Sequence, residues 1–263
     1  MNLLLKHAEM TGQIIGIIPA RYGSTRFPGK PLASILGKTL LQRTYENSLR
    51  ASALSDLIVA TDDERIFEHV RSFNGKVVMT SEQCPTGTDR LAEVLSLYPE
   101  WMHATAIVNI QGDEPCLNPL TINLAVQALV NDPQGQVSTI VTPLLNEEEA
   151  KNSSIVKCVM DQQGNALYFS RALIPSNKTN SFKNGAIYFR HLGLYVYRPS
   201  FIIDYQKLPS TPLQLEEDLE QLKVLEHGYR IKVAIVEQAN IGVDTPEDIH
   251  KVEEWLCKQN TFL

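Results

Sequence analysis

The feature that most constrains the fold is an alternation of short apolar runs with helix-patterned segments, which continues from Ile14 to Val130. Short runs rich in Ile, Val and Leu are typical of buried strands, whereas apolar residues three and four apart indicate amphipathic helices. Strands joined through helices run parallel, so this order predicts a mostly parallel sheet with helices on both faces. The predicted strands are Ile14–Ile18, Leu57–Thr61, Val77–Thr80 and Ala106–Ile110, and the predicted helices are Thr39–Ala51, Asp63–Phe73, Thr88–Leu97 and Thr121–Val130.

The middle of the chain follows a different pattern, because its apolar runs lack full helices between them. The residues Gln162–Asn165 are typical of a turn that joins two of these runs. This part therefore predicts a smaller, mixed sheet inserted after the parallel half. The expected strands are Val137–Pro143, Ile155–Asp161, Ala166–Ser170 and Leu192–Tyr197, followed by a helix Leu215–His227, a strand Ile231–Val236 and a helix Pro246–Lys258.

Charge and composition exclude several classes of function. The formal net charge is −6, which argues against a surface for nucleic acid or for an anionic membrane. No apolar run reaches the roughly 18 residues that span a bilayer, and the extension 1–13 is too weakly apolar for a signal peptide. Its role stays open. The four cysteines have no CxxC spacing, so we expect reduced thiols in a cytoplasmic protein rather than a zinc or redox site.

The segment Pro19–Pro31 directly follows the first predicted strand and carries Arg21, Arg26 and Lys30. Ligands of open α/β sheets bind beyond the carboxyl ends of the strands. Two glycines permit tight turns there and two prolines stiffen the loop, so the segment suits a triphosphate. It matches neither a dinucleotide-binding glycine pattern nor a P-loop, since Pro31 stands where the P-loop has Ser or Thr. A solvated basic loop is the alternative.

Two aspartates are candidates for a metal site. Asp113 follows the strand Ala106–Ile110, and Asp244 comes shortly after the strand Ile231–Val236, so we expect both at one rim of the sheet. Magnesium bound with nucleotides uses one or two carboxylates together with phosphate oxygens. The alternative for Asp244 is a helix start with Thr245 as the N-cap. Glu114 could ligate the metal instead of Asp113.

The segment Thr86–Arg90 is a third element expected at this rim. Thr88 is suited to cap the helix that follows, and Gly87 permits a flat base to approach the backbone closely. Arg90 is placed to reach back toward a phosphate. The alternative is an ordinary helix cap with a surface arginine.

Six segments follow one another in the chain: Ile18–Pro31, Val108–Pro115, Ala166–Ala172, Arg190–Tyr195, Leu219–Leu222 and Gly242–Asp248. In this order they closely resemble the 3-deoxy-manno-octulosonate cytidylyltransferases, also called CMP-KDO synthetases. The resemblance extends over nearly all of Ile14–Trp255. It departs from the commonest pattern at Thr86, where Ser is usual, at Asp89, where Glu is usual, and more strongly over Gln214–Asp218.

The resemblance implies a homodimeric, magnesium-dependent enzyme of lipopolysaccharide synthesis that uses CTP and 3-deoxy-manno-octulosonate (KDO). One domain over residues 1–263 would comprise a nucleotide-binding half at 14–135, a sugar-binding and dimerisation half at 136–230, and a return to the main sheet at 231–263. Asp113 and Asp244 would bind the metal and would be catalytic together with Arg21 and Lys30. The implied nucleotide-binding residues are Arg21, Ser24, Arg26, Lys30, Thr86, Gly87, Thr88 and Arg90. The implied sugar-binding residues are Gln111, Arg171, His191, Tyr195, Glu220 and Gln221.

In the expected reaction the anomeric hydroxyl of the sugar acid attacks the α-phosphorus of CTP and pyrophosphate leaves. Two Mg²⁺ ions would activate the hydroxyl and neutralise the leaving group, and the fork of Arg171 would pair with the sugar carboxylate. Three alternatives stay open. The substrate could be sialic acid or an amino analogue of KDO, the enzyme could be a metal-dependent glycosyltransferase, or the chain could be an inactive binding module. Tyr195, His191 and Glu220 each also suit ordinary structural roles.

Overall fold

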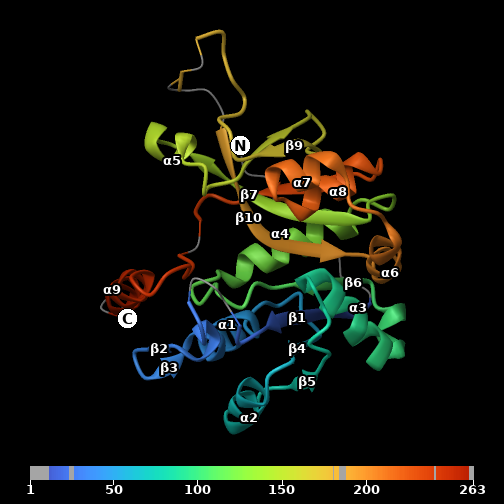
Figure 1. Ribbon diagram of the computed structural model, residues 1–263, viewed down its shortest axis with the longest axis vertical. Coiled ribbons are helices and arrows are strands. Elements are labelled where there is room, and N and C mark those ends of the chain that lie inside the picture. Colours follow the sequence, from blue (N-terminus) through green and yellow to red (C-terminus); the bar gives the residue numbers. More distant parts are fainter. Residues whose placement is uncertain (1–11, 24–26, 180, 184–187, 240, 261–263) are drawn as a thin grey trace.

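A single twisted sheet runs through the part of the chain that the computed structural model describes, residues 12–23, 27–179, 181–183, 188–239 and 241–260 (Figure 1). Nine described strands form it, with the path β11-β7-β10-β6-β1-β4-β5; β8 pairs with β10, and β9 pairs with β8. The strands are β1 Ile14–Ala20, β4 Asp56–Thr61, β5 Val77–Met79, β6 Ala106–Asn109, β7 Val137–Leu144, β8 Lys157–Met160, β9 Ala166–Ser170, β10 Tyr188–Tyr197 and β11 Ile231–Ile235. A separate hairpin pairs β2 Ser34–Ile35 with β3 Lys38–Thr39.

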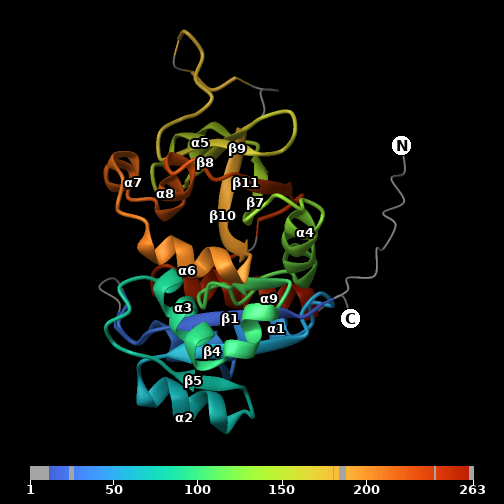
Figure 2. The same cartoon turned by 90° about the vertical axis from the view of Figure 1, so that its right-hand side faces the viewer.

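Helices cover both faces of the sheet because the strands are apolar on both sides. In β1, Ile14 and Ile18 pack with α1, α2 and α4, whereas Ile15 and Ile17 pack with α3, α6 and α8. Figure 2 shows α4 on one side of β10 and α7 and α8 on the other. The helices are α1 Leu40–Ser48, α2 Glu64–Ser72, α3 Gly87–Leu97, α4 Pro119–Val130, α5 Glu147–Lys151, α6 Pro199–Lys207, α7 Pro212–Glu217, α8 Glu220–Glu226 and α9 Asp248–Asn260, with 3₁₀ turns at Lys30–Leu32 and Pro99–His103.

The predicted fold class is confirmed. Strands β4, β1 and β6 are parallel neighbours, and β5 extends them. The mixed part continues the same sheet, because β10 is antiparallel to both β6 and β7, and β8 and β9 form the hairpin predicted around Gln162–Asn165. The turn of this hairpin contains Gly164 in a left-handed conformation with φ of +76°, which favours glycine.

The prediction of one helix over Leu215–His227 is wrong, since two helices occupy this region. Helix α7 ends at Glu217, and Asp218 then adopts a left-handed conformation with φ of +52° before α8 begins at Glu220. Helix α6 was not predicted, although Pro199 at its first turn is a typical helix start.

The C-terminal strand β11 lies parallel to β7 at the sheet edge, and so it points in the same direction as β6. Helix α9 then packs through Val252 against Ile35 and Leu40, beside α1 (Figure 2). The segment between β11 and α9 therefore crosses the rim at which β1 and β6 end. None of the helices in the described part of the chain is long and apolar enough to cross a membrane.

Candidate active site

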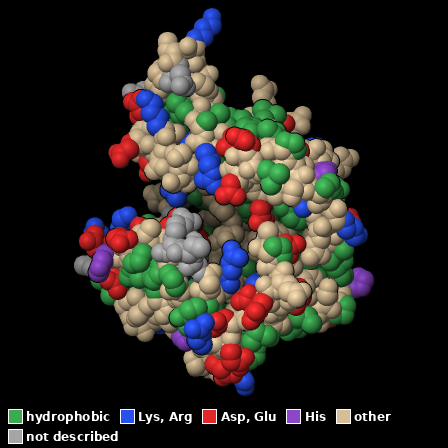
Figure 3. All heavy atoms as spheres, viewed as in Figure 1, with side chains coloured by type: hydrophobic (Ala, Val, Ile, Leu, Met, Phe, Trp, Pro, Cys, Tyr) green, Lys and Arg blue, Asp and Glu red, His purple; other side chains and the backbone are tan. Residues whose placement is uncertain are grey.

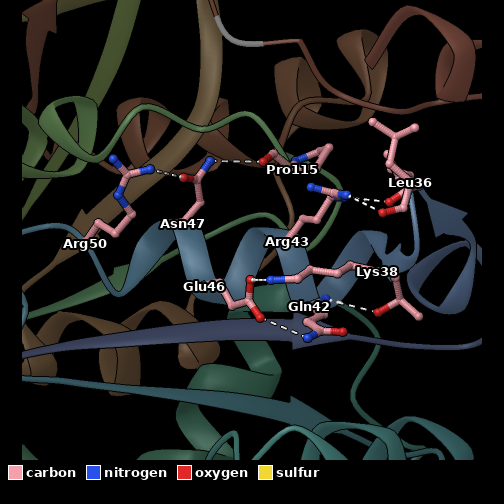
Figure 4. Close-up of polar contacts among 10 residues, drawn as sticks. Leu36, Lys38, Gln42, Arg43, Glu46, Asn47, Arg50 and Pro115 are labelled. Carbon is pink, nitrogen blue, oxygen red and sulfur yellow. Dashed lines mark hydrogen bonds and ion pairs between the residues drawn. The ribbon is translucent and has the colours of Figure 1, made fainter. Parts of the chain in front are cut away.

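Helix α1 holds the loop that follows β6 through side-chain hydrogen bonds. The Thr44 hydroxyl donates to the Gly112 carbonyl at 3.2 Å. The Asn47 amide donates to the Pro115 carbonyl at 3.0 Å, as Figure 4 shows. Arg43 donates in the same way to the Ile35 and Leu36 carbonyls at 2.8 and 3.0 Å. The helix therefore holds both the β2–β3 hairpin and the loop that carries Asp113.

Lys30 joins the basic loop to both segments that carry the candidate aspartates. Its Nζ lies 2.6 Å from Asp113 Oδ2 and donates to the Val243 carbonyl at 3.0 Å. The Val243 amide in turn donates to the Asp113 carbonyl at 2.9 Å. The structure thus brings Asp113 and the residue before Asp244 together, as expected from strands that end at one rim.

The Asp244 side chain is exposed, and the start of α9 is made by other residues. The Asp248 carboxylate accepts from the Asp244 and Thr245 amides at 3.1 and 3.0 Å, and α9 begins at Asp248. The Lys251 contact and these amides hold the pKa of Asp248 at about 2, although burial opposes them. Thr245 is therefore not the N-cap of α9, and the Asp244 carboxylate has no part in this turn.

Glu114 adds a third carboxyl group to the pair of aspartates. Burial, and then the charges of Asp113 and Asp244, raise its pKa to about 7, while Arg190 and Lys30 oppose this. Its Oε2 is buried and has no hydrogen-bond partner among the described residues. A Cβ atom at Gly242 would lie 3.0 Å from Glu114 Oε1, so a larger residue there would press on the Glu114 carboxyl group.

Clustered carboxyl oxygens of this kind fit a hard divalent cation, which would offset their mutual repulsion. Among the described residues, no group of three or more His, Cys, Asp or Glu side chains is arranged to hold a metal ion unaided. A cation bound at Asp113 and Asp244 would therefore need oxygens from a ligand such as a triphosphate.

A cavity of about 440 Å³ opens above this cluster and is lined by the end of β1, the basic loop and the β6 loop. Figure 3 shows that this face is hollowed between the two halves of the molecule, with charged side chains around the opening. The predicted residues Ser24 and Arg26 lie outside the described residues. The lining residues are Pro19, Ala20, Arg21, Gly23, Lys30, Pro31, Leu40, Gln111, Gly112 and Asp113.

The Thr86–Arg90 segment differs in detail from the prediction. Thr86, not Thr88, is the N-cap of α3, because its hydroxyl accepts from the Asp89 amide at 3.2 Å. Thr86 and Gly87 border a smaller cavity together with Arg21. The Arg90 side chain is only 3% exposed and pairs with Asp62 at 2.5 Å and with Thr80. Arg90 also borders the same small cavity as Thr86 and Gly87.

Arg90→Met is expected to lower the free energy of unfolding by about 3 kcal/mol, because it leaves the Asp62 carboxylate without its partner in a largely buried place. Denaturant unfolding measures this. The CTP affinity of the folded fraction should change little. A loss of CTP affinity without a loss of stability would assign Arg90 to a phosphate instead.

A second cavity, of about 370 Å³, adjoins the first and shares Arg21 and Gln111 with it. The Gln111 amide donates to the Gly193 carbonyl at 3.0 Å, which fixes the side chain between the two cavities. The second cavity contains the predicted His191, Tyr195, Glu220 and Gln221. It is also lined by Gly87, Thr88, Asn109, Val137, Val156, Gly193, Tyr197, Tyr205, Asp218, Leu219 and Val224.

His191 is held as a neutral ring in this wall. Burial lowers its pKa to about 3, and its Nε2 lies 2.9 Å from the Thr139 hydroxyl. That hydroxyl donates to the Leu194 carbonyl at 2.8 Å, so Nε2 must carry the proton and Nδ1 is the acceptor. A ring with this pKa is a poor base near neutral pH and is suited to hydrogen bonding.

Comparison with known proteins agrees with this geometry. The protein-family model described as cytidylyltransferase matches residues 15–232. A 3-deoxy-manno-octulosonate cytidylyltransferase from Protochlamydia amoebophila (strain UWE25) is 98% identical over 259 residues, covering 98% of this chain and all of the relative. The chain belongs to the 3-deoxy-manno-octulosonate cytidylyltransferases. The enzyme of that name from Chlamydia trachomatis serovar L2 is 50% identical over 250 residues, 95% of this chain and 96% of the relative.

Solved structures agree with this membership. A CMP:2-keto-3-deoxy-manno-octonic acid synthetase complexed with CTP superposes with a TM-score of 0.87 at 37% identity, over 94% of this chain and 99% of that one. A 4-diphosphocytidyl-2C-methyl-D-erythritol synthase from Anaerococcus prevotii has a TM-score of 0.61 at 16% identity, over 94% and 96% of the two chains, and shares the fold alone.

Arg171, implied by the cytidylyltransferase family pattern as a sugar-binding residue, is not in the wall of the second cavity but contacts Asp218, which is. Its guanidinium donates to the carbonyls of Glu217 at 2.8 Å and of Ser153 and Asp218 at 3.3 Å. The Glu217 carboxylate also accepts a hydrogen bond from the Arg171 backbone amide at 2.9 Å. Arg171 thus ties the end of α7 to the end of β9.

Arg171→Lys is expected to raise the KM for the sugar acid more than the KM for CTP, because an ammonium group reproduces neither a bidentate carboxylate contact nor the fork that holds the end of α7. Steady-state kinetics with each substrate varied in turn gives both constants. Equal changes, or no change for the sugar acid, would remove Arg171 from the sugar side.

The sequence interpretation missed three groups in the wall of the second cavity. Tyr197 and Tyr205 are buried, and Asn109 is buried with its Oδ1 unpaired among the described residues. Tyr197 lies two residues after Tyr195 on β10, so the period of two along a strand was the signal that could have found it. Tyr205 lies on the unpredicted helix α6, and no local pattern marked it.

Proposed function

We propose that this chain transfers CMP from CTP to 3-deoxy-D-manno-octulosonate and releases pyrophosphate. The observation that carries the proposal is the junction of two cavities at Arg21 and Gln111. One is lined by Lys30 and Asp113, and the other by tyrosine, histidine and glutamate side chains. The 98% identity with a 3-deoxy-manno-octulosonate cytidylyltransferase supports the choice of CTP and KDO as substrates.

The first cavity suits the triphosphate and the second suits the sugar acid. Since the whole chain is acidic, with a net charge of −6, a triphosphate requires local cations, which Arg21 and Lys30 supply. The second cavity presents several hydrogen-bonding groups to a polyhydroxylated ligand. A ligand that fills both cavities would place its reacting atoms next to Arg21 and Gln111.

In the reaction, the anomeric hydroxyl of the sugar acid loses its proton to water and its oxygen forms a bond to the α-phosphorus. The bond from that phosphorus to the bridging oxygen breaks, and pyrophosphate leaves with the electron pair. The protein contributes mainly orientation and charge. Arg21 lies where the two cavities meet and is placed to offset charge on the transferred phosphoryl group, while Gln111 is anchored through Gly193 at the same place.

Asp113 and Asp244 are the residues that would hold Mg²⁺. The ion would supply positive charge against the phosphate oxygens and would lower the pKa of a bound hydroxyl. The Oε2 atom of Glu114, which has no hydrogen-bond partner in the described part of the chain, and the exposed Asp244 support this choice. Lys30 keeps Asp113 in place through its 2.6 Å contact.

A pyrophosphate-release assay with CTP, Mg²⁺ and a panel of 2-keto sugar acids tests the function. Release that requires both CTP and KDO is expected. Faster release with sialic acid or an amino analogue of KDO would reassign the acceptor. Release of a nucleoside diphosphate from a nucleotide sugar, with none from CTP, would indicate a glycosyltransferase.

The remaining parts of the proposal concern the cell rather than the site. We infer a homodimer in the cytoplasm that activates KDO for lipopolysaccharide synthesis, in line with the family resemblance. Light scattering after size exclusion measures the oligomeric state, and a monomer at the concentrations used for the assay would contradict the dimer.

A further inference from the structure

The first turn of α3 meets the first turn of α8 at a hydrogen bond in the second cavity. The Thr88 hydroxyl donates to Glu220 Oε2 at 3.3 Å, and both residues line that cavity. Thr88 is only 3% exposed, so its hydroxyl has little access to solvent, whereas the Glu220 carboxylate faces the cavity. The bond therefore connects a buried anchor with a side chain that a ligand can reach.

The neighbours of this pair fix the backbone of α8 and place charges around the Glu220 carboxylate. Lys223 and Arg21 favour its ionised form and Asp89 disfavours it, while Tyr197 also hydrogen-bonds with Thr88. The Tyr205 hydroxyl donates to the Glu220 carbonyl at 3.5 Å, and Lys223 Nζ lies 4.1 Å from the centroid of the Tyr205 ring. Burial raises the pKa of Glu220, and the Thr88 hydrogen bond opposes that rise. Thr88 thus stabilises the ionised, acceptor-only form of the carboxylate.

We propose that Thr88 is a positioning residue for the sugar acid, acting through Glu220, and not a contact for the nucleotide. This inference rests on the function proposed above. A glutamate at a cavity wall has several side-chain rotamers, and the bond to Thr88 selects one of them before the ligand arrives. A sugar hydroxyl then meets an oriented acceptor, so less conformational entropy is lost on binding.

The position of Thr88 also connects the two substrate sites. Its neighbours Thr86 and Gly87 border the small cavity beside Arg21, whereas its own hydroxyl points to the sugar side. A shift of the α3 N-terminus would therefore move Glu220. The nucleotide side and the sugar side of the enzyme meet in this one helical turn.

The test is the substitution Thr88→Val, which keeps the shape of the side chain and removes the donor. The KM for KDO is expected to rise about fivefold to tenfold, which lies within the net range of an ordinary hydrogen bond, while the KM and the dissociation constant for CTP stay within about twofold. Thr88→Ser keeps the hydroxyl and should restore the wild-type KM. Thermal melting confirms that each variant is folded. If Thr88→Val does not fold, Thr88→Ala takes its place in the test.

A double-mutant comparison decides whether Thr88 acts through Glu220. Glu220→Gln alone should raise the KM for KDO, and Thr88→Val added to it should raise that KM by less than about twofold more, because the two changes remove the same interaction. Fully additive effects, or a CTP affinity that falls as much as the KDO affinity, would overturn the inference. A wild-type enzyme that releases no pyrophosphate from CTP with any sugar acid would instead contradict the proposed function.

Discussion

Lys30→Ala is expected to lower turnover at least about a hundredfold while the protein stays folded, because the variant loses a preorganised cation where charge develops on the phosphates. The side chain is 16% exposed and reaches both Asp113 and the Val243 carbonyl, so its loss also frees the segment that leads to Asp244. Steady-state pyrophosphate release measures the effect.

The stability of Lys30→Ala should change little. Its partner Asp113 is 34% exposed and can be hydrated, so the pair contributes about 1 kcal/mol, which corresponds to a melting temperature lower by about 2–4 °C. Lys38→Ala is the matched control, since Lys38 pairs with Glu46 at 2.5 Å on the exposed face of α1 and should be dispensable (Figure 4). Near-normal turnover of Lys30→Ala would show that the loop is merely a basic surface.

The position of the site at one rim of the sheet was predictable because the carboxyl ends of parallel strands lie at the same edge. The alternation of strand and helix patterns places the residues after β1 and β6 on one side of the sheet, whatever the side chains are. The same argument reached Asp244, because β11 runs in the direction of β6 although β7 and β10 lie between them. The Lys30–Asp113 contact is the local result of this arrangement.

The details that sequence could not give depend on tertiary partners. Thr86 and Thr88 are equally suited to cap a helix, and the choice of Thr86 leaves Thr88 free to reach Glu220 on a distant helix. Arg90 meets Asp62 and Thr80, which follow two neighbouring strands, so only the assembled sheet defines its environment.

The break between α7 and α8 has the same kind of cause. It falls at Asp218, where neither glycine nor proline marks a helix end. Arg171 donates to the carbonyls of Glu217 and Asp218 that the break leaves without helical partners. A contact from residue 171 is invisible to any pattern within the helix, and so the sequence predicted one continuous helix.

Asp113→Asn and Asp244→Asn are each expected to reduce magnesium-dependent turnover by more than about a hundredfold, although the two residues lie far apart in the sequence. Each change removes a charge that a hard cation needs and keeps nearly the same shape. Pyrophosphate release titrated with Mg²⁺ measures the loss, and calorimetric titration of the CTP-bound protein with Mg²⁺ measures binding without turnover.

The two variants should differ in stability, and this difference separates a metal site from a helix start. Asp113→Asn weakens the 2.6 Å contact with Lys30 and should melt slightly lower. The exposed Asp244 forms no ion pair with any residue that the structure describes, so Asp244→Asn should melt as the wild type does. The control is Asp248→Asn, which alters the carboxylate that holds the turn before α9 and should reduce stability more than turnover. If Asp244→Asn keeps wild-type activity across the titration while Asp113→Asn is inactive, the two-aspartate metal site is wrong.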